Sequence, residues 1–300
     1  MATEHKITPF LWFDTQAEEA AEFYTSLFDG AKILSVSRYG EGAPAPAGTA
    51  MSVNFELKGQ PFIALNGGPA FQFTPAVSFL VACRTRDEVK SLWSGLSPGG
   101  APLMDLGEYP FSELYGWMAD RYGLSWQVMF FGEREILQSI TPTLMFVGAQ
   151  CGRAEEAIAF YALVFRNSGV GEVMRYGADE APDREGTIKH AGFTLEGQEF
   201  AAMDSAHPHD FSVNEAISFL VHCANQAEVD HYWGKLSSVP DAERCGWLKD
   251  RFGLSWQIIP GVLGELLGDP DAEKSKRVMQ AMLQMKKIDI GGLKRAYDGK

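Results

Sequence analysis

The sequence Asp-Arg-Phe-Gly-Leu-Ser-Trp-Gln at residues 250–257 repeats an earlier stretch almost letter for letter. Residues 120–127 read Asp-Arg-Tyr-Gly-Leu-Ser-Trp-Gln, so the two copies differ only by Phe for Tyr at the third position. Each copy joins a polar turn that contains glycine to an apolar segment typical of a strand. Two such copies in one chain indicate internal duplication, and we expect two equivalent modules.

Other landmarks recur in the same order and support the duplication. They are Ile-Thr-Pro at 7–9 and 140–142, Phe-Tyr at 23–24 and 160–161, and Arg-Tyr-Gly at 38–40 and 175–177. The predicted domains are therefore a first module at 5–131, a linker at 132–139, a second module at 140–262 and a helical tail at 263–300.

Within a module, the spacing of apolar residues predicts alternating strands and helices. The first module has strands at 7–13 and 33–39, a hairpin at 51–65 and a strand at 77–83. Helices are predicted at 17–28 and 86–96, and a loop at 40–48. The predicted fold class is α+β, with tandem βαβββ modules that form a shared curved mixed sheet and carry their helices outside.

The tail adds an amphipathic helix at roughly 270–287. Asp269 followed by proline is typical of a helix N-cap. An apolar stripe is expected to dock this helix on the second module, and its members are Val278, Met279, Met282, Leu283 and Met285.

Composition excludes several classes of partner. The chain has 300 residues, a net charge of −13 and a pI near 4.9, which disfavours binding to nucleic acid or to an anionic membrane. No signal segment is evident in residues 1–6, and no apolar run is long enough for a membrane span. Four scattered cysteines without a CxxC pair predict a reduced, cytoplasmic protein.

The repeated motifs resemble the vicinal oxygen chelate superfamily of glyoxalase and bleomycin-resistance proteins, and within it the PhnB-like branch labelled 3-demethylubiquinone-9 3-methyltransferase-like. Metal-dependent members of this superfamily bind a divalent ion through a His early in the first strand and a Glu in the last strand of a module. The resemblance places these positions at Thr8, Gln127, Thr141 and Gln257. Because Thr and Gln offer only neutral oxygens, we expect no metal site.

No nucleotide cofactor is expected either. The glycine-rich stretches at 65–69 and 97–100 follow a hairpin and a helix, whereas a phosphate-binding turn joins a strand to the helix that follows it. S-adenosylmethionine is therefore not predicted as a cofactor, and the expected partner is a small-molecule ligand. The two modules are predicted to pair within one chain, and a homodimer is left open.

Strand alternation predicts which side chains line a concave face. The expected pocket combines apolar surface with scattered hydrogen-bonding groups, a composition typical of a small-molecule site. A filled core is the alternative. The predicted lining residues are Thr8, Phe10, Trp12, Asn54, Gln127, Met129, Thr141, Thr143, Met145 and Gln257.

Two histidines of the second module, His190 and His222, are the candidate catalytic groups, because imidazole titrates near neutral pH. A purely structural role is the alternative for each. The segment at 207–210, His-Pro-His-Asp, contains metal-ligand types but is expected to be an exposed loop. The repeated Asp-Arg pairs are expected to fix a turn, with Asp capping backbone N–H groups and Arg pairing with carboxylates.

Three functions remain open from the sequence. The first is a metal-independent small-molecule protein of the PhnB-like type. The second is a non-enzymatic protein that sequesters its ligand, as resistance proteins do. The third is the quinone O-methyltransferase activity that the family label suggests.

Overall fold

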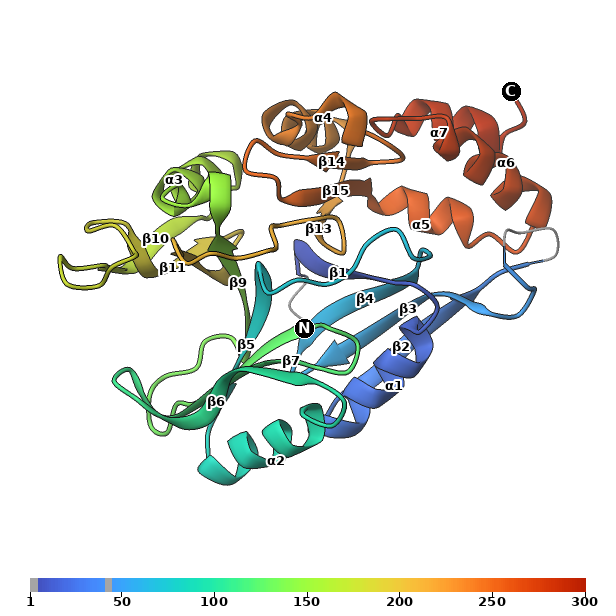
Figure 1. Ribbon diagram of the computed structural model, residues 1–300. Helices are drawn as coiled ribbons and strands as arrows, with labels where there is room; N and C mark the ends of the chain where they lie inside the picture. Colours follow the sequence, from blue (N-terminus) through green and yellow to red (C-terminus); the bar gives the residue numbers. More distant parts are fainter. Residues whose placement is uncertain (1–4, 41–44) are drawn as a thin grey trace. The chain divides into compact units, whose positions relative to one another are not determined.

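The computed structural model describes residues 5–40 and 45–300, and in these ranges fifteen strands form two mixed sheets, of seven and eight strands. Seven α-helices lie between and after the strands in these ranges (Figure 1). The α+β class is thereby confirmed, although the strands fall into two sheets. Residues 41–44 of the predicted loop and residues 1–4 lie outside the described ranges.

By its internal contacts the chain divides into a smaller unit, Met1–Pro9 with Ser218–Lys300, and a larger unit, Phe10–Ile217. The boundary crosses the strands β1 and β13. The strands up to the linker are β1 (Ile7–Phe13), β2 (Lys32–Arg38), β3 (Ala50–Leu57), β4 (Gln60–Asn66), β5 (Val77–Cys83), β6 (Ala101–Tyr109), β7 (Ser112–Ala119) and β8 (Ser125–Phe130). Those that follow are β9 (Ile140–Phe146), β10 (Gly169–Arg175), β11 (Ile188–Leu195), β12 (Gln198–Asp204), β13 (Ile217–Cys223), β14 (Trp247–Lys249) and β15 (Ser255–Pro260).

In the larger unit, one sheet is built from halves of both repeats. Its strand order is β10-β11-β12-β9-β5-β8-β7-β6. The repeats meet where β5 pairs antiparallel with β9, in a register that sets Ser78 opposite Thr143 and Leu80 opposite Thr141. The same unit contains β1 from Phe10 onward, paired parallel with β4, and the antiparallel pairs β4–β3 and β3–β2.

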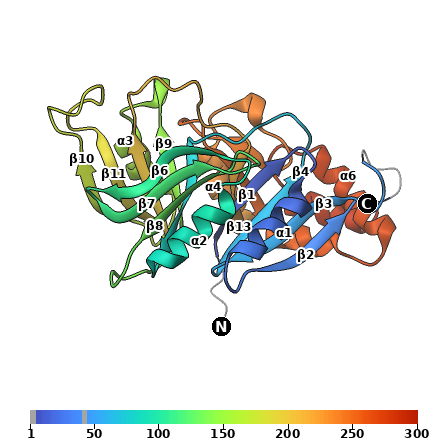
Figure 2. The same cartoon turned by 60° about the horizontal axis from the view of Figure 1, so that its bottom comes forward.

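The helices of the larger unit are α1 (Ala17–Leu27), α2 (Arg86–Leu96) and α3 (Ala154–Val164). Figure 2 shows α1 along β3 and α2 along the β7–β8 side of the eight-stranded sheet. Aromatic residues fill the space beneath α1, because a helix with one apolar face must bury that face. The Trp126 ring lies 5.4 Å from Tyr24, 5.5 Å from Phe28 and 5.6 Å from Phe79, as measured between ring centroids.

The repeated Asp-Arg turn anchors this core. Asp120 is 3 % exposed and accepts four hydrogen bonds. Oδ1 accepts from the backbone N–H groups of Tyr122 (2.8 Å) and Leu124 (3.0 Å), and Oδ2 accepts from the Tyr24 hydroxyl (2.7 Å) and the Trp126 indole (2.9 Å). Burial raises the pKa of the Asp120 carboxyl, and the four hydrogen bonds oppose that shift. The predicted structural role of the aspartate is confirmed.

The arginine of the first turn behaves differently from the prediction. Its guanidinium lies 4.1 Å from the centroid of the Phe23 ring, a cation–π contact. Within residues 5–40 and 45–300, Arg121 thus stacks on the aromatic residue of α1 and forms no ion pair with a carboxylate.

The hairpin β6–β7 was missed by the sequence interpretation. Three register shifts interrupt the pairing of β6 with β7, between Pro102 and Met104, between Met104 and Gly107, and between Gly107 and Tyr109. Such irregularities destroy the period-two pattern by which strands are recognised. In the second repeat, the 3₁₀ turn Pro240–Ala242 and the three residues of β14 stand in this place.

The smaller unit contains β13, β15 and β14 in that order, with α4 (Gln226–Leu236) after β13. The start of β1 joins this unit, because the His222 N–H donates to the Lys6 carbonyl at 3.0 Å. The twin turn is built as in the first repeat. Asp250 accepts from the N–H groups of Phe252 (2.8 Å) and Leu254 (3.0 Å) and from the Trp256 indole (2.9 Å).

The tail forms three helices, α5 (Gly261–Leu267), α6 (Ala272–Leu283) and α7 (Ile290–Tyr297), so the single helix predicted at 270–287 is shorter in the structure. Asp271, not Asp269, is the N-cap of α6 and accepts from the N–H groups of Glu273 and Lys274. Val278 is fully buried and Met282 and Met285 pack around it, but Leu283 is 51 % exposed, against the predicted stripe.

Candidate functional site

Gln127 forms the centre of a polar group on one face of the eight-stranded sheet. Its Oε1 accepts from the Tyr115 hydroxyl at 2.8 Å, and its Nε2 donates to Ser78 Oγ at 2.8 Å. All three side chains are nearly inaccessible to solvent. Burial raises the pKa of Tyr115, so the phenol stays protonated and acts as a donor.

The register of the strands brings two predicted threonines to the same face. Leu80 lies opposite both Gln127 on β8 and Thr141 on β9, and directly paired residues point to the same side of a sheet. Thr143 is paired with Ser78 in the next row. Met129, paired with Tyr115, extends this face, which therefore contains Gln127, Thr141, Thr143 and Met129.

The equivalent positions of the second repeat form a similar group in the smaller unit. Gln257 Nε2 donates to Ser218 Oγ at 3.0 Å, as Gln127 does to Ser78. Thr8 Oγ1 lies 2.9 Å from His222 Nε2, so one catalytic candidate contacts one predicted lining residue. Thr8 and Gln257 are both buried, whereas His222 is exposed.

The other predicted lining residues, on β1, β3 and β9, have contacts or burial of their own. The Trp12 indole donates to the Gly68 carbonyl at 2.8 Å and contacts the Phe71 ring edge-on. Asn54 Nδ2 donates to Ser35 Oγ at 2.9 Å, between β3 and the edge strand β2. Phe10 and Met145 are buried core residues, at 8 % and 4 % exposure.

His190 is half-buried on β11, where it pairs with Met174. Burial lowers the pKa of His190, while the nearby Glu172 carboxylate opposes this shift. A neutral imidazole can accept a proton, so His190 keeps the chemistry of a weak base. His190 belongs to the larger unit and His222 to the smaller one.

The histidines of the 207–210 segment have different partners. His207 Nε2 lies 3.6 Å from an Asp183 oxygen, and His209 Nε2 lies 2.9 Å from Ser205 Oγ. Among residues 5–40 and 45–300, no three His, Cys, Asp or Glu side chains are grouped as metal ligands would be.

The side chains at the positions of Gln127 and Gln257 do not have the donor chemistry of a divalent-ion site of the superfamily type. Such a site uses imidazole and carboxylate ligands, whereas Gln127 and Gln257 supply amides. Gln127 Oε1 accepts from a phenol and Nε2 donates to a hydroxyl, so the amide is held by neutral groups and supplies no negative charge to an ion. The important role of Tyr115 was missed from the sequence, because it lies in the unrecognised hairpin.

Solved structures include similar proteins. The PhnB protein of Bacillus cereus is 47% identical over 42% of this chain and 99% of its own, with a TM-score of 0.41. Glyoxalase I of Zea mays is 12% identical, covers 83% of this chain and 89% of its own, and has a TM-score of 0.51, which shows a shared fold. Comparison with curated proteins finds no match.

No helix of the described ranges has the length and apolar character needed to cross a membrane. One family profile matches the chain twice, at residues 5–129 and 138–259, and these segments contain both copies of the Asp-Arg-(Tyr/Phe)-Gly-Leu-Ser-Trp-Gln sequence. The chain belongs to the 3-demethylubiquinone-9 3-methyltransferase family.

Proposed function

We propose that the protein binds a small, partly apolar molecule without a metal ion, on the sheet face that contains Gln127. The observation that carries the proposal is the chain Tyr115–Gln127–Ser78, in which a hydrogen-bonded amide lies at the position that the superfamily resemblance assigns to a metal-binding carboxylate. Neutral donors and acceptors beside apolar side chains favour an uncharged ligand with polar substituents.

A substituted quinone is the first ligand class to test, because the family name refers to a demethylubiquinone. Quinone oxygens are neutral acceptors and the ring is apolar, which matches the threonine hydroxyls and the Met129 side chain on this face. A cytoplasmic location is part of the proposal and rests on the scattered cysteines. Binding and release without chemistry, as in a sequestering protein, is the second candidate, since the Tyr115–Gln127–Ser78 chain consists of neutral hydrogen-bonding groups.

Thermal unfolding in the presence of separate probes tests the proposal. A quinone at a hundred times its dissociation constant adds about 2.7 kcal/mol of stability, which is expected to raise Tm by roughly 4 °C. Gln127→Ala is expected to reduce this shift, and Gln280→Ala, an exposed glutamine in α6, serves as the matched control. Unchanged shifts in Gln127→Ala would refute the proposed site.

Metal and methyl-donor arms complete the experiment. Ni²⁺, Zn²⁺ and Mn²⁺ are expected to leave Tm of the wild type unchanged, and S-adenosylmethionine is expected to do the same. Metal stabilisation that disappears in Gln127→Ala would overturn metal independence. Recovery of unmodified quinone after incubation would favour sequestration over catalysis.

A further inference from the structure

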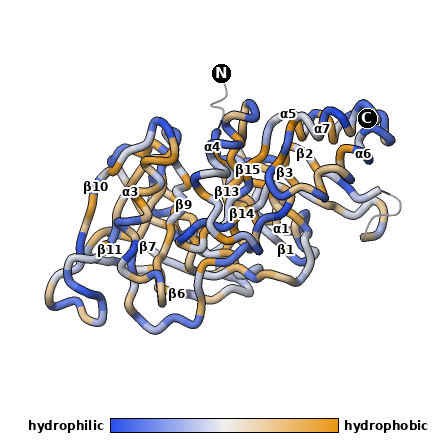
Figure 3. Tube along the Cα trace, turned by 90° about the horizontal axis from the view of Figure 1, so that it is seen from above, coloured by the Kyte–Doolittle hydropathy of each residue, from blue (hydrophilic) through white to orange (hydrophobic). Residues whose placement is uncertain are grey.

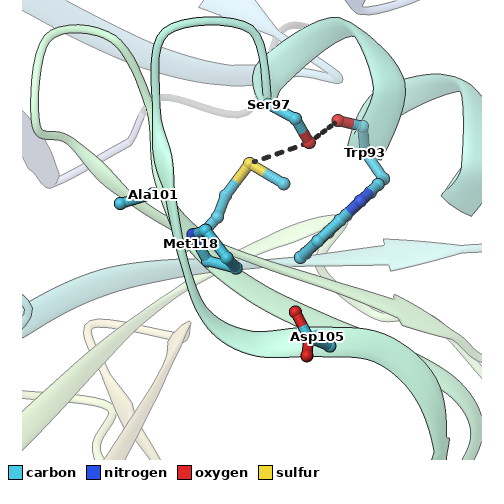
Figure 4. A pocket seen from close by; sticks show the side chains of 6 residues that line it. Trp93, Ser97, Ala101, Asp105 and Met118 are labelled. Carbon is cyan, nitrogen blue, oxygen red and sulfur yellow. Dashed lines mark hydrogen bonds between the residues drawn. The ribbon is translucent and has the colours of Figure 1, made fainter.

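A separate cavity lies on the opposite, helix-covered side of the hairpin β6–β7. It has a volume of about 250 Å³. Figure 4 shows the side chains that surround it, with the Trp93 ring, the Met118 thioether and the Asp105 carboxylate turned toward one region. The lining residues are Trp93, Ser97, Ala101, Pro102, Asp105 and Met118.

The aromatic wall of this cavity is fixed by its neighbours. Gly116 on β7 leaves room for the indole, because a Cβ at that position would lie 2.4 Å from a Trp93 ring carbon. Ser97 Oγ donates to the Trp93 carbonyl at the end of α2 and lies 3.9 Å from Met118 Sδ. Met118 is 1 % exposed, so the floor beside the indole is packed.

The acidic group of the cavity lies where β6 is irregular. Asp105 falls between Met104 and Gly107, where the pairing with β7 changes register. Irregular strand segments of this kind redirect side chains, and here the exposed Asp105 side chain lines the same cavity as the Trp93 ring (Figure 4). In the described part of the chain no Lys or Arg forms an ion pair with Asp105, whose backbone carbonyl accepts from the Tyr109 hydroxyl.

From this arrangement we infer that the cavity binds a small organic cation, an ammonium group attached to an aromatic or alkyl body. The carboxylate and the indole face both attract a cation, and the methionine and proline contact its apolar part. The volume corresponds to about eight water molecules, which limits the ligand to roughly ten non-hydrogen atoms. The net charge of −13 also raises the local concentration of cations.

The cavity depends on a hairpin that the second repeat lacks. The helix of the second repeat has Trp233 at the position of Trp93, but only three residues of β14 follow it. The cation site is therefore specific to the first repeat. It lies outside the polar group around Gln127, so its test does not depend on the proposed function.

Titration with phenethylammonium, observed through indole N–H signals in NMR spectra, tests the inference. The Trp93 signal is assigned by its loss in Trp93→Phe. 2-Phenylethanol has a hydroxyl in place of the ammonium and measures how strongly the cavity binds the same body without a positive charge. The Trp93 signal is expected to shift on addition of phenethylammonium, and to shift at lower concentrations than with 2-phenylethanol.

Two variants test whether Asp105 causes the preference for phenethylammonium over 2-phenylethanol. Asp105→Asn is expected to weaken phenethylammonium binding about three- to fivefold, the effect of one exposed charge pair, and to leave 2-phenylethanol binding unchanged. Glu108→Gln, an exposed acid on the same strand that does not line the cavity, is expected to change neither. An unmoved Trp93 signal, or equal loss of both ligands in Asp105→Asn, would overturn the inference.

Discussion

Replacement of Asp120 by Asn tests how the repeated turn stabilises the fold. The substitution preserves shape, and the amide oxygen can still accept from the N–H groups of Tyr122 and Leu124. The amide nitrogen then faces two donors. The Tyr24 hydroxyl can rotate and accept, but the Trp126 indole N–H cannot accept and is left without a partner inside the core.

The magnitude follows from these contacts. A buried donor without a partner costs about 1–3 kcal/mol, and loss of the charge on the acceptor weakens the remaining hydrogen bonds. We expect Asp120→Asn to lower the free energy of unfolding by about 3 kcal/mol, a large share of a typical total of about 5–15 kcal/mol. With a urea m-value of about 3 kcal/mol/M, the unfolding midpoint moves by about 1 M.

Urea unfolding followed by tryptophan fluorescence and circular dichroism measures this change. Asp105→Asn, an exposed position, is the control and is expected to stay within about 0.5 kcal/mol of the wild type. Tyr24→Phe removes one of the same hydrogen bonds, so the double variant is expected to cost less than the two single variants added together. A wild-type midpoint in Asp120→Asn would refute the reasoning.

Three further predictions concern packing and cysteine chemistry. Gly116→Ala is expected to destabilise the protein by about 1–3 kcal/mol in the same urea assay, since the new methyl group would overlap the Trp93 indole. Gly107→Ala, on the same hairpin, is expected to have little effect, because the nearest atom to the new methyl group lies at 4.0 Å. Val278→Ala is expected to lower the free energy of unfolding by about 1–3 kcal/mol, because Val278 is buried in the tail. Leu283 is 51 % exposed, so Leu283→Ala is expected to lower it by less than about 0.5 kcal/mol, and equal losses would contradict the packing of the tail. Burial raises the pKa of Cys83 from 9.0 to about 12, so its thiol contributes stability fully below pH 9 and loses that contribution as pH rises toward 12. Iodoacetamide at pH 8 is accordingly expected to leave Cys83 unmodified until urea is added, as mass spectrometry would show, and rapid labelling of the folded protein would contradict its burial.

The sequence predicts most of the fold because the duplication supplies each pattern twice. The strand at 77–83 and the helix at 86–96 begin and end in the structure at the predicted residues, since their apolar spacing is regular and Thr85 caps the helix. The β6–β7 hairpin is different, because its register shifts break the alternation that identifies strands.

The candidate site could be predicted only by position. Strand parity places Gln127 with Thr141 and Thr143 on one face, as the register shows. Parity cannot identify Tyr115, because its hydrogen bond to Gln127 depends on the β7–β8 pairing of an unpredicted hairpin. The exposure of the apolar residues of β10 could not be predicted either, because the sequence pattern does not distinguish them from buried strand residues. Figure 3 shows the hydrophobic stretch of that strand.

The eight-stranded sheet joins β5–β8 of the first repeat to β9–β12 of the second through one antiparallel pair. When two identical chains form such a joint, every substitution appears on both sides of it at once. In a single fused chain each substitution appears once, so one repeat can change while the other keeps its half of the β5–β9 strand pair. The first repeat has the hairpin β6–β7 and its cavity where the second repeat has only the 3₁₀ turn Pro240–Ala242 and the short strand β14, which illustrates the freedom to diverge that fusion gives a duplicated protein.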